Sequence, residues 1–162
     1  MSVALREIMS DPMFQENLKQ LAGASGLENQ IAQISVIDTP LVPLPLYSLE
    51  DDVFVLSSLY LYQNDPEKML EAVKNLQIMG VSALCIKTDL YVHSIPESIV
   101  TFCDQHGLPL FITAVPGISF RKIISTVQEH IKAADQAQRS SAIFDGYLRG
   151  NTKSMFAKLV SD

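Results

Sequence analysis

Six residues with small polar or charged side chains end or directly follow three short hydrophobic runs in the middle of this chain. They are Ser57, Ser58, Lys87, Thr88, Asp89 and Thr113. Hydroxyl groups, one ammonium group and one carboxylate can hold a small polar or anionic metabolite where a fold brings them together. The same residue types are also ordinary in solvated loops, with Lys87 paired to Asp89. The residues alone leave both interpretations open.

The sequence carries none of the familiar patterns of catalysis or metal binding. Ser57 and Ser58 stand outside G-x-S-x-G, and the histidines at 93, 106 and 130 form no H-x-x-x-H or H-E-x-x-H. There is no C-x-x-C, and Asp51-Asp52 lacks the spacing of a calcium loop. No glycine-rich loop follows any hydrophobic run, which disfavours nucleotide phosphates. We therefore predict no catalytic residue, no metal and no cofactor.

The hydrophobic runs predict how the fold positions the six residues. Runs at 53–58, 83–88 and 108–113 alternate with amphipathic segments at 65–80 and 96–107. Continuous apolar runs are typical of a parallel sheet covered on both faces, so we predict an α/β fold with a βαβαβ unit. The whole sheet is expected to have about four or five mainly parallel strands. Their carboxyl ends meet at one edge, where the six residues would gather.

The flanking segments extend this unit. Two short helices, broken at Asp11-Pro12, are predicted over 3–21, and a partly exposed strand over 33–38. The segment 39–52 has three prolines, including the apolar stretch Leu41–Leu46, and is predicted to be an extended loop or strand edge. Asp65 and Ser94 are the expected N-caps of the two central helices.

A long helix is predicted from residue 118, because the chain then has no proline, and no glycine until Gly146. Residues along this helix recur at steps of three and four, which fits the seam of a coiled coil formed with a second copy of the chain. The seam residues proposed for dimerisation are Ile123, Val127, Ala134 and Phe144. The helix either protrudes as a linker or folds back on the sheet. We favour protrusion, with a domain at 1–120, a linker helix at 121–148 and the start of a following region at 149–162.

Composition restricts the partners and the compartment. Residues 1–120 hold five Lys and Arg against 14 Asp and Glu, whereas residues 121–162 hold seven against four. An acidic body repels nucleic acid, so any DNA contact is expected from another part of the protein. The sequence has no run of eighteen apolar residues, which is about the length that a membrane-spanning helix needs. Its charged N-terminus does not resemble a signal peptide. Cys85 and Cys103 are expected to be reduced core thiols, which favours the cytoplasm.

Four segments, in their order and spacing, resemble the N-terminal domain of the purine catabolism regulator (PucR-like) family of bacterial transcription factors. They cover about residues 4–127 and read LREIMSDPMFQENLKQLAGASGLENQIAQISVID, DDVFVLSS, LQIMGVSALCIKT and IPESIVTFCDQHGLPLFITAVPGISFRKIISTV. The resemblance implies an effector-sensing domain that precedes a middle region and a C-terminal helix-turn-helix. Neither would be complete here, which is the pattern of a fragment or an isolated sensor domain.

The chain departs from the family at its first core strand. Relatives often carry a glutamate before this strand, and threonines followed by glycine after it. Here Val53 stands at the glutamate position, Ser57 and Ser58 at the threonines, and Leu59 at the glycine. The purine in the family name is therefore not carried over to this chain.

The expected function is the regulatory part of a bacterial transcription regulator, which senses a small-molecule effector and forms a homodimer. DNA would be bound only through a C-terminal domain not present in this chain. One alternative is a ligand-free dimerisation scaffold with the same helix seam. A small α/β enzyme is the less favoured alternative, because it would need a polar cluster with perturbed ionisation in a cleft.

Overall fold

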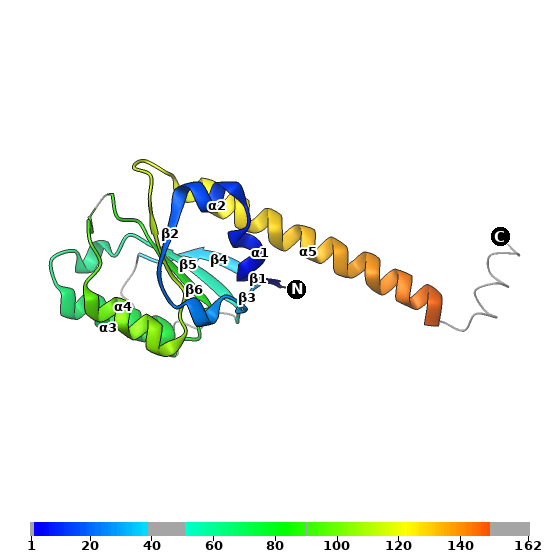
Figure 1. The fold of residues 1–162 in the computed structure, drawn as a ribbon, viewed down its shortest axis with the longest axis horizontal. Coiled ribbons are helices and arrows are strands. Elements are labelled where there is room, and N and C mark those ends of the chain that lie inside the picture. The colour runs from blue at the N-terminus through cyan, green and yellow to red at the C-terminus, as the bar shows by residue number, and fades with distance from the viewer. Residues whose placement is uncertain (1, 39–50, 90, 150–162) are drawn as a thin grey trace, which may run out of the picture.

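A computed structural model describes residues 2–38, 51–89 and 91–149 of the 162-residue chain. Its centre is a five-stranded sheet with the strand order β2-β7-β6-β5-β4 (Figure 1). The strands are β2 (Leu18–Ala22), β4 (Gln33–Val36), β5 (Val53–Ser57), β6 (Ala83–Ile86) and β7 (Leu110–Thr113). Strands β4 to β7 are parallel, and β2 joins β7 antiparallel. The mainly parallel α/β sheet is thus confirmed.

Helices cover both faces of this sheet, with α3 and α4 on one side of the strands and α2 and the start of α5 on the other in Figure 1. One face carries α3 (Pro66–Ile78) and α4 (Glu97–His106). The other carries α1 (Leu5–Met9), α2 (Pro12–Asn17) and the start of α5 (Phe120–Arg149). The smaller elements are the paired strands β1 (Val3–Ala4) and β3 (Gln30–Ile31) and the 3-10 turns η1 (Ala24–Gly26) and η2 (Tyr60–Tyr62).

The two faces of the sheet contribute to separate hydrophobic cores. Val53, Val55 and Leu84 face α3 and α4, whereas Phe54 and Cys85 face α1, α2 and α5. Strand β5 is buried at every position. This double coverage explains why its sequence is a continuous apolar run rather than an alternating one.

Aspartate side chains cap the starts of α2 and α3. The Asp65 carboxylate accepts the Lys68 N–H at 3.1 Å, as predicted, and Asp11 caps α2 in the same way through the Met13 N–H at 2.9 Å. The prediction for Ser94 is wrong, because α4 begins after Pro96 without a side-chain cap. Proline at that position already holds φ at −56°, so the turn forms without a side-chain acceptor.

The second N-terminal helix is shorter than predicted. It ends at Asn17, whose side-chain amide donates back to the Met13 carbonyl at 2.8 Å, and residues from Leu18 form β2. The positions of Phe14, Leu18 and Leu21 fit a helical stripe. From Leu18 onward, however, the backbone makes its hydrogen bonds by pairing with β7. Tertiary pairing therefore overrides the local helical pattern.

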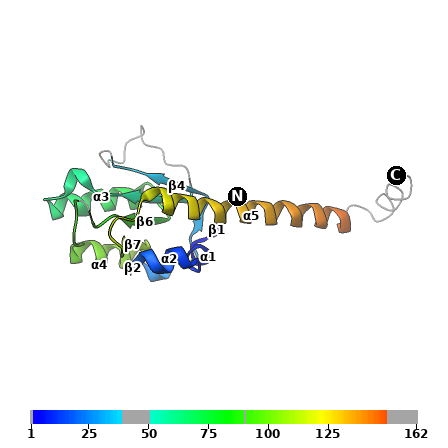
Figure 2. The same cartoon turned by 90° about the horizontal axis from the view of Figure 1, so that it is seen from above.

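Helix α5 leaves the body of the domain partway along its length, and its far half extends beyond the sheet in both views (Figures 1 and 2). Its first turns pack on the sheet, whereas residues 136–144 are all exposed. The long C-terminal helix is thus confirmed. The division at residues 120 and 148 stays a prediction. The proline segment Leu41–Leu46 and residues 150–162 lie outside the described residues.

Candidate functional site

The carboxyl ends of β4, β5, β6 and β7 meet at one edge of the sheet, which we call the strand-end edge. The six predicted residues lie at this edge; hydrogen bonds hold the side chains of five of them, and Lys87 contacts an aromatic ring. Ligands of parallel α/β sheets bind beyond this edge, so it is the candidate site.

A carboxylate that the sequence analysis did not select organises the end of β5. Asp38 Oδ1 accepts hydrogen bonds from Ser57 Oγ at 3.1 Å, from Ser58 Oγ at 2.9 Å and from the Ser58 N–H at 2.8 Å. Ser57 Oγ in turn accepts the Leu59 N–H at 3.1 Å. Both serines are therefore engaged with protein groups. The signal for Asp38 was its place two residues after the end of β4, the strand that is parallel to β5.

The residue after these serines explains one departure from the family pattern. Leu59 has φ of +52°, in the left-handed region that favours glycine. Its side chain is buried and packs in the core beneath α3 and α4. Burial of a large apolar side chain, worth about 1.5–3 kcal/mol, offsets the backbone strain. A glycine is therefore not required for this turn.

The ends of β6 and β7 are joined by two threonines. The Thr88 N–H donates to Thr113 Oγ1 at 3.1 Å, and Thr88 Oγ1 donates to the Thr113 carbonyl at 3.2 Å. These bonds link the two strands just beyond their last paired residues, Ile86 and Ile112, and Thr113 is buried there. The pair fixes the spacing of the loops that follow β6 and β7.

Asp89 links the end of β6 to the loop that leads into α5. Its Oδ2 accepts the Gly117 N–H at 2.7 Å. Its Oδ1 is buried and has no hydrogen-bond partner among the described residues. Lys87 does not pair with this carboxylate; its Nζ lies 5.6 Å from the centre of the Phe120 ring, a cation–π contact at the first residue of α5.

Apolar side chains surround this polar group. Five exposed large hydrophobic residues follow the ends of the four parallel strands: Val36, Tyr60, Leu61, Tyr91 and Val115. The rings of Tyr60 and Tyr91 meet edge to face, with centroids 4.8 Å apart. Tyr91 lines a pocket of about 290 Å³ together with other residues of the loops after β5 and β6, including Asn64 and His93, and with the start of α3. Apolar walls beside a few polar groups are typical of ligand sites.

The residues predicted for dimerisation fall into two groups. Ile123 and Val127 are fully buried in the core beneath α5, and Ala134 packs against it. The first two are therefore removed from the expected seam, because the domain itself covers them. Phe144 is 62% exposed, as is the neighbouring Ile143 at 67%. Among the described side chains of α5, Ile143 and Phe144 are the large hydrophobic ones that are exposed, and they lie on its far part.

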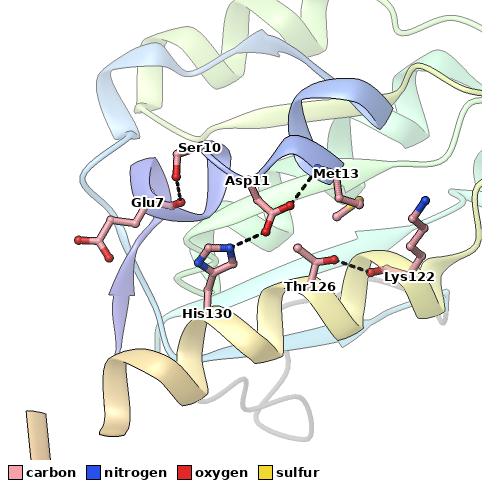
Figure 3. A network of polar contacts seen from close by, with 7 residues as sticks. All are labelled: Glu7, Ser10, Asp11, Met13, Lys122, Thr126 and His130. Carbon is pink, nitrogen blue, oxygen red and sulfur yellow. Dashed lines mark hydrogen bonds and ion pairs between the residues drawn. The ribbon is translucent and has the colours of Figure 1, made fainter. Parts of the chain in front are cut away.

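A further contact that the sequence analysis missed ties α5 to the N-terminal helices (Figure 3). His130 Nε2 lies 2.9 Å from Asp11 Oδ2, while Asp11 Oδ1 caps α2. The hydrogen bonds from His130 and from the Met13 N–H lower the pKa of Asp11 below its ordinary value of 3.8. The two residues are 119 positions apart, so no local pattern could have paired them.

We expect His130→Ala to destabilise the domain by about 1 kcal/mol, the upper range for a partly exposed ion pair. A lowered carboxyl pKa stabilises the fold above the ordinary pKa, and this contribution is lost as pH falls through the folded value. The difference between wild type and variant should therefore shrink below about pH 4. Urea unfolding at a series of pH values measures it. A constant difference at all pH values would mean that His130 acts by packing alone.

The two cysteines, Cys85 and Cys103, are buried free thiols. Burial raises the pKa of the Cys85 thiol, and burial together with nearby Asp104 raises that of Cys103 to about 12.

Within the described ranges, no group of three or more His, Cys, Asp or Glu side chains could hold a metal ion. In the same part of the chain, no helix is long and apolar enough to cross a membrane.

Sequence comparison identifies the family of this chain. The chain belongs to the Purine catabolism regulatory protein-like family (PucR), which matches residues 7–131. It is therefore a domain of a family of transcriptional regulators. The chain is 25% identical over 138 residues to the purine catabolism regulatory protein of Bacillus subtilis (strain 168). The match covers 85% of this chain and a quarter of the length of that relative.

Proposed function

We propose that this chain is the effector-sensing and dimerising domain of a bacterial transcription regulator, in the cytoplasm, that signals through α5 to a DNA-binding domain elsewhere in the protein. The observation that carries the proposal is the connection between the strand-end edge and α5. Gly117, whose N–H donates to Asp89, lies in the loop that leads into this helix, and Phe120, contacted by Lys87, is its first residue. A ligand at the edge would therefore touch the residues that position α5.

The proposed mechanism is a shift between two packings of α5. Asp89 Oδ1 is a buried acceptor that has no partner among the described residues, so an effector that donates to it gains a strong hydrogen bond. An effector that also engages Lys87 would draw this ammonium away from Phe120. A ligand shifts such an equilibrium only by its difference in affinity for the two states. The regulator would respond when one packing of α5 binds the effector better.

Dimerisation is proposed through the projecting half of α5. Ile143 and Phe144 expose large apolar surfaces on this half, which is the type of surface that helix pairing buries. The Bacillus subtilis relative is about four times as long as the matched segment, which leaves it room for a DNA-binding region. Paired helices would join two sensing domains to that region.

The first experiment is a thermal-shift screen of this chain against metabolite classes, followed by titration of any hit into the variant Lys87→Ala. An acidic effector should bind the variant at least about tenfold more weakly, a loss of about 1.4 kcal/mol. The matched control is Lys74→Ala. Lys74 also lies over an aromatic ring, that of Phe102 at 5.9 Å, but on α3. Binding to Lys87→Ala with wild-type affinity would remove the strand-end edge as the site.

A ligand-free dimerisation scaffold is the second candidate, and the exposed Ile143 and Phe144 favour it. A screen without any thermal shift, combined with a dimer mass in sedimentation equilibrium, would support the scaffold. A monomer mass up to high micromolar concentration would count against both the sensing dimer and the ligand-free scaffold, because each pairs through α5.

A further inference from the structure

A groove between α5 and the edge strand β4 lies apart from the strand-end edge. Its volume is about 380 Å³, which is within the range of small-molecule sites. Residues of β4 line it near the amino end of that strand, whereas the strand-end edge lies beyond its carboxyl end. The lining residues are Ala32, Gln33, Ile34, Gln128, Ile131, Lys132 and Asp135.

Three polar side chains of α5 line this groove at the spacing of successive helical turns. Gln128, Lys132 and Asp135 stand at positions i, i+4 and i+7, so they follow one side of the helix. Asp135 Oδ1 is buried and has no hydrogen-bond partner in the described part of the chain. The side chains of Gln128 and Lys132 likewise make no hydrogen bond or ion pair across residues 2–38, 51–89 and 91–149. The groove therefore presents an amide, a cation and a shielded acceptor together.

The two charges restrict the ligand. An anion would face the Asp135 carboxylate, and a simple cation would face the Lys132 ammonium. A molecule that carries both charges can pair with each, and a buried acceptor gains most from a charged donor. We propose that the groove between β4 and α5 binds a small zwitterion of the size of a free amino acid. Its ammonium group would donate to Asp135 Oδ1, and its carboxylate would face Lys132.

The position of this site gives the ligand control over α5. Asp135 is the last partly buried residue before the exposed stretch 136–144. A ligand held between β4 and Asp135 would fasten the helix to the body at the turn where it departs. The site is independent of the strand-end edge, so it stands whether or not an effector binds there.

The test is a thermal-shift titration of the intact chain with the free amino acids, one at a time. The strongest compound is then compared with its amide, which keeps only the positive charge, and with its N-acetyl derivative, which keeps only the negative charge. We expect a saturable rise in melting temperature with the zwitterion and at least a tenfold loss of affinity for either derivative. Equal binding of one derivative would overturn the proposal, as would the absence of any shift.

Variants locate the site. Asp135→Asn and Lys132→Ala should each weaken binding at least tenfold, whereas Lys122→Ala, an exposed lysine on the same helix outside the groove, should not. Melting temperatures without ligand show whether each variant folds. Wild-type affinity in folded Asp135→Asn would overturn the assignment. If that variant binds amino acids normally but its mass in solution differs from that of the wild type, the groove is instead a contact between copies of the chain.

Discussion

Replacing Ile123 with alanine is expected to lower the free energy of unfolding by about 2–5 kcal/mol, the range for isoleucine truncation in a core. Ile123 is fully buried where α5 crosses the sheet, in the cluster that includes Phe54 and Phe111. The loss combines the transfer of its methyl and methylene groups with the cavity left between helix and sheet. Urea unfolding, followed by circular dichroism, measures the change.

The same substitution twenty residues further along α5 is the control. Ile143 is 67% exposed, so Ile143→Ala should change the free energy of unfolding by no more than about 0.5 kcal/mol in a dilute sample. The pair therefore compares the packed and projecting halves of one helix with one chemical change. A large loss for Ile143→Ala that grows with protein concentration would show that a second copy covers this residue. Equal losses at every concentration would contradict the projection of α5.

The sequence predicted the central βαβαβ unit because burial on both faces leaves a local signature. Strands β5, β6 and β7 read as short apolar runs, and Asp65 and Gly107 mark helix ends through local backbone chemistry. Strand β2 was missed because its signal is not local. Leu18 to Ala22 form a strand only because β7 offers a free edge, a partner more than 85 residues away.

The sequence predicted which strand-end residues form the candidate site, but not the residues that bind them. Parallel strands place their carboxyl ends together, so Ser57, Thr88 and Thr113 were expected to be neighbours. The partners of Ser57 and Asp89 were not predicted, because Asp38 and Gly117 reach these two residues from loops whose conformation depends on the whole fold. The helical spacing of Ile123 and Val127 could not separate a dimer seam from a core, since both bury one stripe of a helix.

The turn around Gly26 carries the second large effect, because the backbone approaches it closely. A Cβ atom at this position would lie 2.2 Å from the Gly107 carbonyl oxygen and 2.7 Å from Pro109 Cδ. The turn η1 thereby packs against the connection between α4 and β7, and Asn29 Nδ2 fastens it by donating to the Ser82 carbonyl at 3.0 Å. The carbonyl of Gly107 belongs to the backbone, so it cannot rotate away as a side chain would.

Gly26→Ala should therefore destabilise the domain by about 3 kcal/mol, at the upper end for overpacking. The control is Gly146→Ala, where a Cβ atom would meet nothing within 4 Å and the residue is helical. Alanine there should favour the helix by about 1 kcal/mol, seen as slower amide exchange in the projecting half of α5 rather than as a higher global midpoint. Urea unfolding and amide exchange of both variants separate the two effects. A wild-type midpoint for Gly26→Ala would mean that η1 does not pack against Gly107, and that the link between the N-terminal turn and the sheet is looser than the geometry requires.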